Sequence, residues 1–233
     1  GQFDAIVIGS GMYGAYTATK LFEFGRRTAN PAQAPRVLVL ESGPFLISEH
    51  VQNLTNLGNL GSFVQEDLVE PGQVGGTPFE KFVKHHRCVG GKSLFWGGWT
   101  PRLVDTDVEK VDADGANLWP DDVREYLFRK AQPDGYEFIE REIGAVPVQD
   151  FINGSLYKDL ETVAQDVIAK KRVPSLKAVL PPPIAVQGES PVSGLFSIDK
   201  FSSLPLLLDS IREAKGKPDN QSKLFLVPYA EVL

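Results

Sequence analysis

An apolar run that breaks into spaced glycines is the feature that most constrains this chain. The run is Ala5-Ile6-Val7-Ile8, and the glycines are Gly9, Gly11 and Gly14. A continuously apolar run predicts a parallel strand that is buried on both faces. Glycines at this spacing after a strand are typical of a tight strand-to-helix turn. There Gly9 permits the tight turn, Gly11 lets the backbone approach a pyrophosphate, and Gly14 lets the following helix pack closely on the strand. The pattern predicts a dinucleotide-binding site, because a helix N-terminus attracts phosphate.

The residues that follow fit this interpretation. Met12 and Tyr13 open the predicted helix, and we expect both to contact the dinucleotide. Apolar residues then recur at helical spacing, namely Ala15, Ala18, Leu21, Phe22 and Gly25. A second buried strand is predicted over 36–40, ended by Glu41 with Ser42 beside it, where an acid binds ribose hydroxyls. Glu41 would repel a 2′-phosphate, so NADP is the least expected ligand.

Composition excludes several classes of function. The net charge is −6 and no basic cluster is present, which argues against a nucleic-acid partner. No stretch is long and apolar enough to predict a membrane span. The single cysteine, Cys88, rules out an intrachain disulfide and suits a reducing compartment. We therefore expect a cytoplasmic protein, and a periplasmic or secreted one is also compatible with the sequence.

The stretch from Pro44 to about Lys81 is polar and rich in glycine and proline. That composition predicts a loop without a long regular element. Loops of this length in compact domains are lids, binding arms or contacts to another subunit.

A second glycine-rich stretch brackets large aromatic residues. Gly90-Gly91 precedes Phe95 and Trp96, and Gly97-Gly98 follows them. Glycines let backbone amides approach a ligand, and aromatic rings offer flat apolar surface, so the stretch suits a planar cofactor ring. The cofactor-binding residues predicted here are Arg87, Gly90, Gly91, Ser93, Trp96, Gly97, Gly98 and Trp99.

A metal site is the weaker interpretation of the histidines nearby. His85, His86 and Cys88 match no complete zinc site, and His50 stands alone in the sequence. A strand that leads into the glycine loop fits better, and we expect no metal. Lys92 is either a cation near the cofactor or an ordinary surface lysine.

Further elements are predicted along the rest of the chain. Trp119-Pro120 opens a helix, and 138–144 is a short helix ended by glycine. Asn153 is the predicted cap of a helix with an apolar face, formed by Leu156, Leu160, Val163 and Val167. The prolines at 181–183 indicate an extended linker or sheet edge. A capped helix around 203–211 and a strand over 224–227 complete the pattern.

The order of these features resembles the glucose-methanol-choline (GMC) oxidoreductases, in particular the branch that contains pyranose oxidases. The resemblance rests on the opening glycine motif, the loop at 89–102 and the Trp-Pro helix entry at 118–122. It implies an α/β fold, with a Rossmann-like FAD-binding domain of GMC type and the start of an α+β substrate domain. In pyranose oxidases a histidine linked to the flavin stands where this chain has Phe95, so the expected FAD is non-covalent.

The resemblance also implies a domain division and a reaction. The first part of the FAD-binding domain is expected at 1–104, the substrate domain and its connections at 105–200, and the return to the FAD-binding domain at 201–233. Val232 is expected to lie near the adenine. The implied reaction is hydride transfer from a CH–OH group of a sugar or another alcohol to flavin.

The last residue, Leu233, directly follows a predicted strand, and we expect an incomplete fold and a truncated chain. In the GMC family the catalytic histidine pair, or histidine and asparagine, lies near the far end of a longer chain. We therefore expect no catalytic residue before Leu233, and a C-terminal half or second chain that completes the fold. A homo-oligomer is a further possibility.

Two other functions fit the opening motif. A nicotinamide-dependent dehydrogenase would use the same glycine turn, but it leaves the aromatic-glycine loop without a role. A non-catalytic dinucleotide-binding or assembly module would hold the nucleotide for structure alone.

Overall fold

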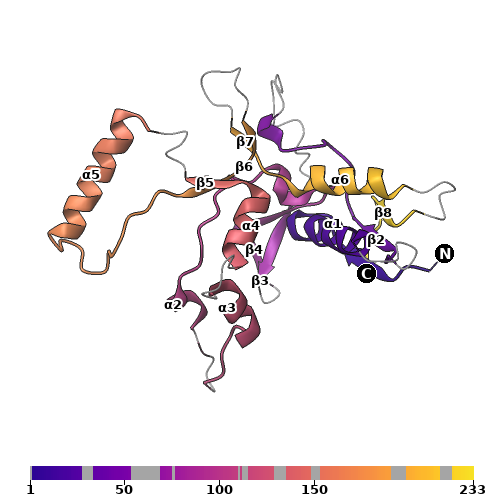
Figure 1. Ribbon diagram of the computed structural model, residues 1–233, viewed down its shortest axis with the longest axis horizontal. Coiled ribbons are helices and arrows are strands. Elements are labelled where there is room, and N and C mark those ends of the chain that lie inside the picture. Colours follow the sequence, from indigo (N-terminus) through magenta and orange to yellow (C-terminus); the bar gives the residue numbers. More distant parts are fainter. Residues whose placement is uncertain are drawn as a thin grey trace. The chain divides into compact units, whose positions relative to one another are not determined.

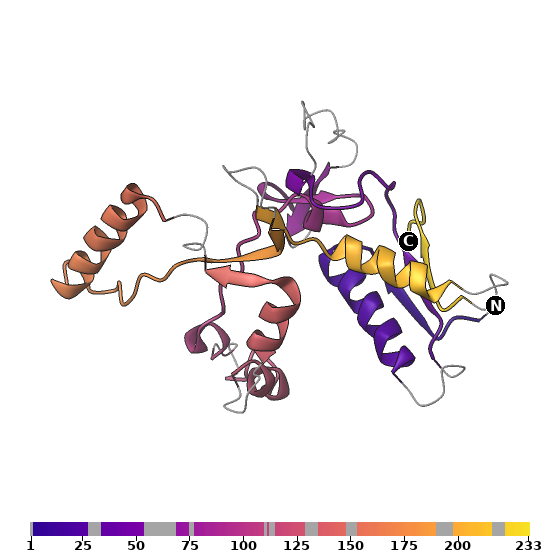
Figure 2. The same cartoon turned by 45° about the horizontal axis from the view of Figure 1, so that its top comes forward.

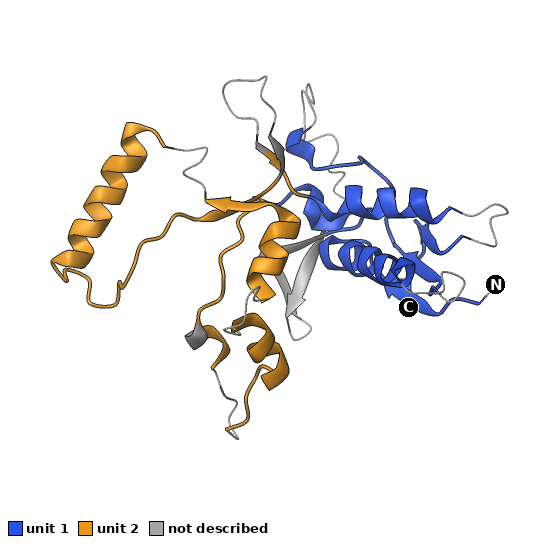
Figure 3. Ribbon diagram, in the orientation of Figure 1, with its two compact units in different colours: residues 1–96, 202–233 blue, residues 97–201 orange. Residues whose placement is uncertain are grey.

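The structure is a computed structural model of residues 1–233. It describes residues 2–27, 34–53, 69–74, 77–109, 111, 115–128, 135–147, 153–189, 198–215 and 222–233. The chain divides into two compact units (Figure 3). Unit 1 comprises residues 1–96 and 202–233, and unit 2 comprises residues 97–201.

Unit 1 contains a parallel sheet. Its strands β1 (Ala5–Ile8), β2 (Val37–Leu40) and β8 (Leu224–Val227) lie in the order β1-β2-β8. Ile6 pairs with Leu38, and Leu38 pairs with Phe225, so the strands are in register and their carboxyl ends meet at one edge. The three strands predicted from the sequence are confirmed, and the unit is a mixed α/β structure.

Helices α1 (Met12–Arg26) and α6 (Ser203–Ala214) pack side by side and cover one face of this sheet (Figures 1 and 2). The core between helices and sheet is aliphatic and aromatic. It consists of Ala15, Ala18, Phe22, Val37, Val39, Leu207, Ala214 and Leu224. The predicted apolar face of the first helix is confirmed in most of its positions, and Thr19, which is also buried, was not predicted.

The prediction that the first strand is buried on both faces is wrong. Ile6 is 59% exposed and Ile8 is 68% exposed, whereas Ala5 and Val7 pack on the core. Side chains alternate along a strand, and α1 and α6 cover only the face that carries Ala5 and Val7. Because every residue of this run is apolar, the sequence shows no alternation between a buried and an exposed face.

The prediction of a loop up to Lys81 is also wrong in part. Strands β3 (Val69–Val74) and β4 (Thr77–His86) pair as an antiparallel hairpin, with a register shift between Pro71 and Gly72. The two glycines between the strands lie outside the described residues. A proline at a register irregularity is tolerated in a strand. The predicted strand leading into the glycine loop is confirmed, because β4 ends at His86.

Unit 2 contains short helices and an antiparallel sheet. Its elements are α2 (Asp105–Val108), α3 (Asp121–Phe128), α4 (Gly135–Ile143), β5 (Ala145–Pro147), α5 (Ser155–Ala169), β6 (Pro183–Glu189) and β7 (Ile198–Lys200). The strands lie in the order β5-β6-β7. The predicted helices after Pro120 and before Gly144 are confirmed, although α4 begins at Gly135 rather than Phe138.

Helix α5 differs from its prediction at the N-terminus. Gly154, not Asn153, is the N-cap residue, and no side chain caps the helix. Leu156, Leu160 and Val163 are 60 to 69% exposed, so the predicted apolar face is present but largely uncovered. Figure 1 shows a long extended segment that leads from α5 to β6.

Among the described helices, none combines the length and the hydrophobicity needed to cross a membrane.

Candidate functional site

The candidate site lies at the carboxyl ends of the parallel strands of unit 1. Gly9 follows β1 with a φ of 85°, a left-handed conformation that favours glycine. Its amide donates to the Leu40 carbonyl at 2.7 Å, which ties the turn to β2. A Cβ on Gly14 would lie 2.0 Å from the Gly9 carbonyl oxygen, so only glycine permits this approach of helix and turn. The predicted steric roles of Gly9 and Gly14 match this geometry.

Gly11 is the N-cap of α1 and borders open space. No atom lies within 4 Å of the position that a Cβ on Gly11 would occupy. The first amides of a helix have no partner within the helix, so those of Met12 and Tyr13 offer donors beside this space. The Tyr13 side chain is 83% exposed. The arrangement can accept an anionic group at the helix N-terminus.

Glu41 lies at the centre of the site and is turned inward, with an exposed fraction of 5%. Its Oε2 accepts hydrogen bonds from the amide and the hydroxyl of Ser10, at 2.8 and 2.7 Å. Its Oε1 accepts from the Gly43 amide at 3.0 Å and from the Ser42 hydroxyl at 3.4 Å. The carboxylate thus joins the turns that follow β1 and β2. A ribose contact, as predicted from the sequence, requires that ribose hydroxyls replace some of these donors.

The turn after β2 also packs against the segment that follows β4. A Cβ on Gly43 would lie 2.0 Å from the Arg87 carbonyl oxygen, so this close backbone contact requires glycine. Arg87 forms an ion pair with Glu231. The Ala230 amide donates to the Glu41 carbonyl at 2.8 Å. The segment after β8, which leads to the half-exposed Val232, is thereby anchored to the same edge of the sheet.

The two glycine motifs meet in unit 1. The position of a Cβ on Gly91 is 3.0 Å from the Gly11 Cα, so the two backbones are in direct contact. The Gly90 amide donates to the Ser10 hydroxyl at 3.3 Å. Gly90 and Gly91 have φ values of 92° and 49°, which the turn requires. The start of the aromatic-glycine loop, 80 residues later in the chain, therefore packs directly against the glycine turn that follows β1.

Ser93 lies within this loop, in the 3-10 helix η5 (Gly91–Leu94), and is fully buried. Its hydroxyl donates to the Gly90 carbonyl at 2.7 Å and bonds the Ser202 hydroxyl at 2.9 Å. Ser202 in turn caps α6 by accepting from the Leu204 amide. The structure gives Ser93 a role in shaping the loop, and its predicted contact with a cofactor stays a prediction.

Cys88 lies between Arg87 and the glycine pair and is 1% exposed. Burial, together with the negative charge of Glu41, raises the pKa of the Cys88 thiol to about 11, against a smaller lowering by a backbone hydrogen bond with Gly91. The thiol is therefore neutral at physiological pH and is a packing residue rather than a nucleophile.

The last predicted cofactor residues belong to unit 2. Gly98 has a φ of 78°, and its carbonyl accepts from the Ala185 amide at 2.7 Å. Trp99 is 62% exposed and forms a β-bridge with Ile184. Gly97 borders open space at its Cβ position. These residues are thus fixed to the start of β6 within their own unit.

Trp99 also lines a pocket of about 460 Å³ in unit 2. Arg102 and Glu140 form its polar wall through two hydrogen bonds, at 2.6 and 2.5 Å. The other walls are apolar and comprise Pro101, Val104, Ala145, Val146, Pro147 and residues 180–183.

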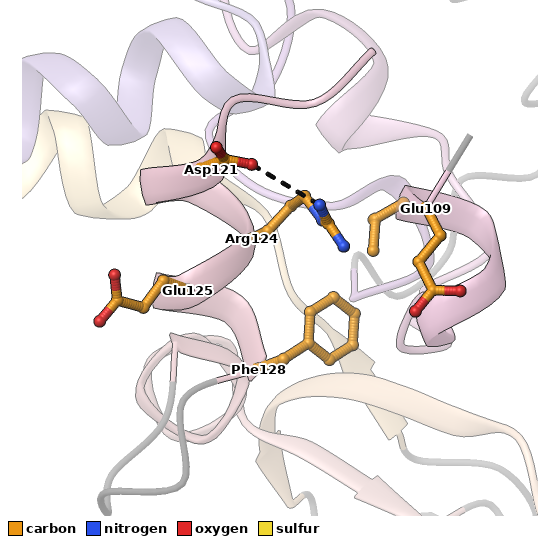
Figure 4. A pocket seen from close by; sticks show the side chains of 6 residues that line it. Glu109, Asp121, Arg124, Glu125 and Phe128 are labelled. Atoms are coloured by element: carbon orange, nitrogen blue, oxygen red, sulfur yellow. Dashed lines mark ion pairs between the residues drawn. The ribbon is translucent and has the colours of Figure 1, made fainter. Parts of the chain in front are cut away.

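A second pocket in unit 2 holds about 310 Å³ between α2 and α3. Figure 4 shows Arg124 directed into it, with Phe128 beside it and Glu109 across from it. Arg124 Nη1 lies 3.6 Å from Asp121 Oδ1. None of the predicted site residues lines this pocket.

Sequence reasoning missed Ser10, Gly43 and His50. Ser10 lies inside the glycine motif, and its position beside Glu41 depends on the pairing of β1 with β2. Gly43 follows the acid by two positions, which is a local signal for a close backbone approach. His50 is buried against the Trp96 carbonyl, a contact that no local pattern indicates.

No protein-family model matches the chain. No curated protein matches it either. One similar solved structure is that of a formate oxidase from Aspergillus oryzae RIB40, which concerns the effect of a mutation on FAD modification. Its sequence identity to this chain is 15%, and the TM-score is 0.49. The similarity covers 97% of this chain and 38% of the formate oxidase chain. This chain therefore spans well under half the length of that protein.

Proposed function

We propose that this chain binds FAD and forms part of an oxidoreductase that acts on the CH–OH group of a sugar or another alcohol. The contact of Gly91 with Gly11 carries the proposal. It joins a dinucleotide turn to a loop of glycines and aromatic residues, and a nicotinamide site would give that loop no role. The resemblance of both motifs to those of GMC oxidoreductases supports the same cofactor.

The residues of unit 1 fit parts of FAD. Gly11 leaves room for a pyrophosphate at the start of α1, where Met12 and Tyr13 supply amides. Glu41 would bind ribose hydroxyls after exchange with the donors of Ser10 or Gly43. In our proposal the loop that begins at Gly90 lies along the flavin, and Val232 lies near the adenine. Phe95 offers no nucleophilic nitrogen, so the cofactor would be held without a covalent bond.

When bound, FAD supplies the redox chemistry by accepting a hydride. The described histidine side chains serve other contacts. His50 bonds the Trp96 carbonyl, and the His86 ring stacks on Phe95. We propose that a C-terminal segment or a second chain supplies the base that takes the hydroxyl proton.

A titration of the purified chain with FAD tests the proposal. We expect quenching of flavin fluorescence that saturates, and no displacement by excess NAD. The matched control is Gly11→Ala, which fills the space at the helix N-terminus. Absence of binding by a folded chain, or displacement by NAD, would contradict FAD as the cofactor. In the complete enzyme, bound FAD that no sugar or alcohol reduces would contradict the oxidoreductase and leave a non-catalytic module.

A further inference from the structure

His50 lies at a defined position in unit 1, and its hydrogen bonds determine which ring nitrogen carries the proton. It precedes the 3-10 helix η2 (Val51–Asn53) and is 1% exposed. Its Nδ1 lies 3.1 Å from the Gln52 amide nitrogen, and its Nε2 lies 2.9 Å from the Trp96 carbonyl oxygen. An amide can only donate, so Nδ1 accepts. Nε2 therefore carries the proton and donates to Trp96.

That hydrogen bond holds the distal end of the loop at 90–96. At the proximal end, Gly90 and Gly91 lie against Ser10 and Gly11. At the distal end, the Trp96 carbonyl is held by His50. The loop thus spans between the dinucleotide turn and a histidine that is 46 residues away from Trp96 in sequence.

The ring of Phe95 is supported as well. His86 stacks on it, with the ring centroids 4.8 Å apart and an angle of 24° between the planes. This contact orients a side chain, whereas His50 acts on the main chain of the loop. Of these two contacts, the His50 hydrogen bond is the directional one and depends on one donor atom, so it can be tested by removing that atom.

We infer that His50 is a positioning residue for cofactor binding: it keeps the loop at 90–96 in the conformation that receives the flavin. The inference rests on the proposed function. His50 acts through the Trp96 carbonyl and does not itself touch the cofactor.

Two amide substitutions separate these roles. In His50→Asn, the side-chain oxygen can accept from the Gln52 amide, as asparagine does two residues before a donor in turns, but the side chain is too short to reach Trp96. In His50→Gln, the longer side chain places an N–H donor near the position of Nε2. We expect His50→Asn to weaken FAD binding about tenfold, the effect of one lost hydrogen bond. We expect His50→Gln to restore most of the affinity.

Amide hydrogen exchange gives a readout that does not need FAD. The amides of residues 93–96 should exchange faster in His50→Asn than in the wild type or His50→Gln, with little change in α1. Equal exchange and equal FAD affinity in both variants would overturn the inference. If the wild type binds no FAD, the proposed function fails, and the exchange comparison still decides whether His50 orders the loop.

Discussion

The amide and the hydroxyl of Ser10 donate to the same oxygen of Glu41, at 2.8 and 2.7 Å, in a site where Glu41 is 5% exposed. The other oxygen accepts from the Gly43 amide. A buried carboxylate with donors on both oxygens is stabilising only while each donor keeps its acceptor. Glu41 therefore links the first two strand ends as well as serving in the proposed ribose contact.

We predict that Glu41→Gln destabilises the fold. The amide group of glutamine would point N–H donors at Ser10 or at Gly43, so one existing donor loses its acceptor. The expected loss of unfolding free energy is about 2 to 3 kcal/mol, measured by urea denaturation. Ser42→Ala is the control, because its hydroxyl contributes only a 3.4 Å contact to the same carboxylate. Equal stability of Glu41→Gln and wild type would show that the carboxylate is not a structural link.

Substitutions of Gly11 and Gly14 should separate binding from folding. A Cβ on Gly14 would lie 2.0 Å from a backbone oxygen, so Gly14→Ala forces the helix away from the turn. We expect a loss of about 3 kcal/mol in unfolding free energy. A Cβ on Gly11 meets no atom within 4 Å, so Gly11→Ala should change stability by no more than about 1 kcal/mol.

The FAD affinity of Gly11→Ala should nevertheless fall by about tenfold or more, because the methyl group occupies the space proposed for the pyrophosphate. Thermal unfolding and FAD titration of both variants check this pair. A folded Gly11→Ala chain with wild-type affinity would refute the assignment of that space to a phosphate.

Unit 2 offers a similar pair for stability. Gly144 has a φ of 64°, and a Cβ there would lie 2.0 Å from the Val186 carbonyl oxygen. Gly115 has a φ of 81°, but its Cβ position is open. Both alanine variants incur backbone strain, and only Gly144→Ala adds a clash with β6. We expect unit 2 to unfold at a lower temperature in Gly144→Ala than in Gly115→Ala. Limited proteolysis at increasing temperature or differential scanning calorimetry measures this difference. Equal melting would mean that the contact with β6 contributes nothing.

The sequence predicted the part of the fold that depends on local signals. The strands β1, β2 and β8, the helix α1 and the glycine turn follow from apolar runs and glycine spacing, and each is observed. The exposure of Ile6 and Ile8 could not be predicted, because it depends on which face the helices cover. A run of apolar residues carries no such information.

The site was predictable only in its glycines. Gly14 packs against Gly9 as the glycine motif predicted, because the spacing within one short motif reflects a local backbone contact. The inward turn of Glu41 toward Ser10 depends on the register of β1 with β2, and the reach of His50 to Trp96 depends on tertiary packing. These contacts join residues that are distant in sequence, and a single sequence does not encode such pairs in any local pattern.

The pH dependence of stability should report on Cys88. Its folded-state pKa is raised from 9.0 to about 11, so the folded protein holds the thiol proton more strongly than the unfolded chain does. The stability from this neutral thiol is fully present below pH 9 and is lost as the pH rises toward 11. Between pH 8 and pH 10 we expect the wild type to lose about 1 kcal/mol more unfolding free energy than Cys88→Ala. Urea denaturation of both proteins at the two pH values measures this difference. Because lysines and tyrosines titrate in both proteins, their contributions to the unfolding free energy cancel in the comparison. A difference of zero, or a larger loss in Cys88→Ala, would mean that the thiol ionises as readily in the folded protein as in the unfolded chain.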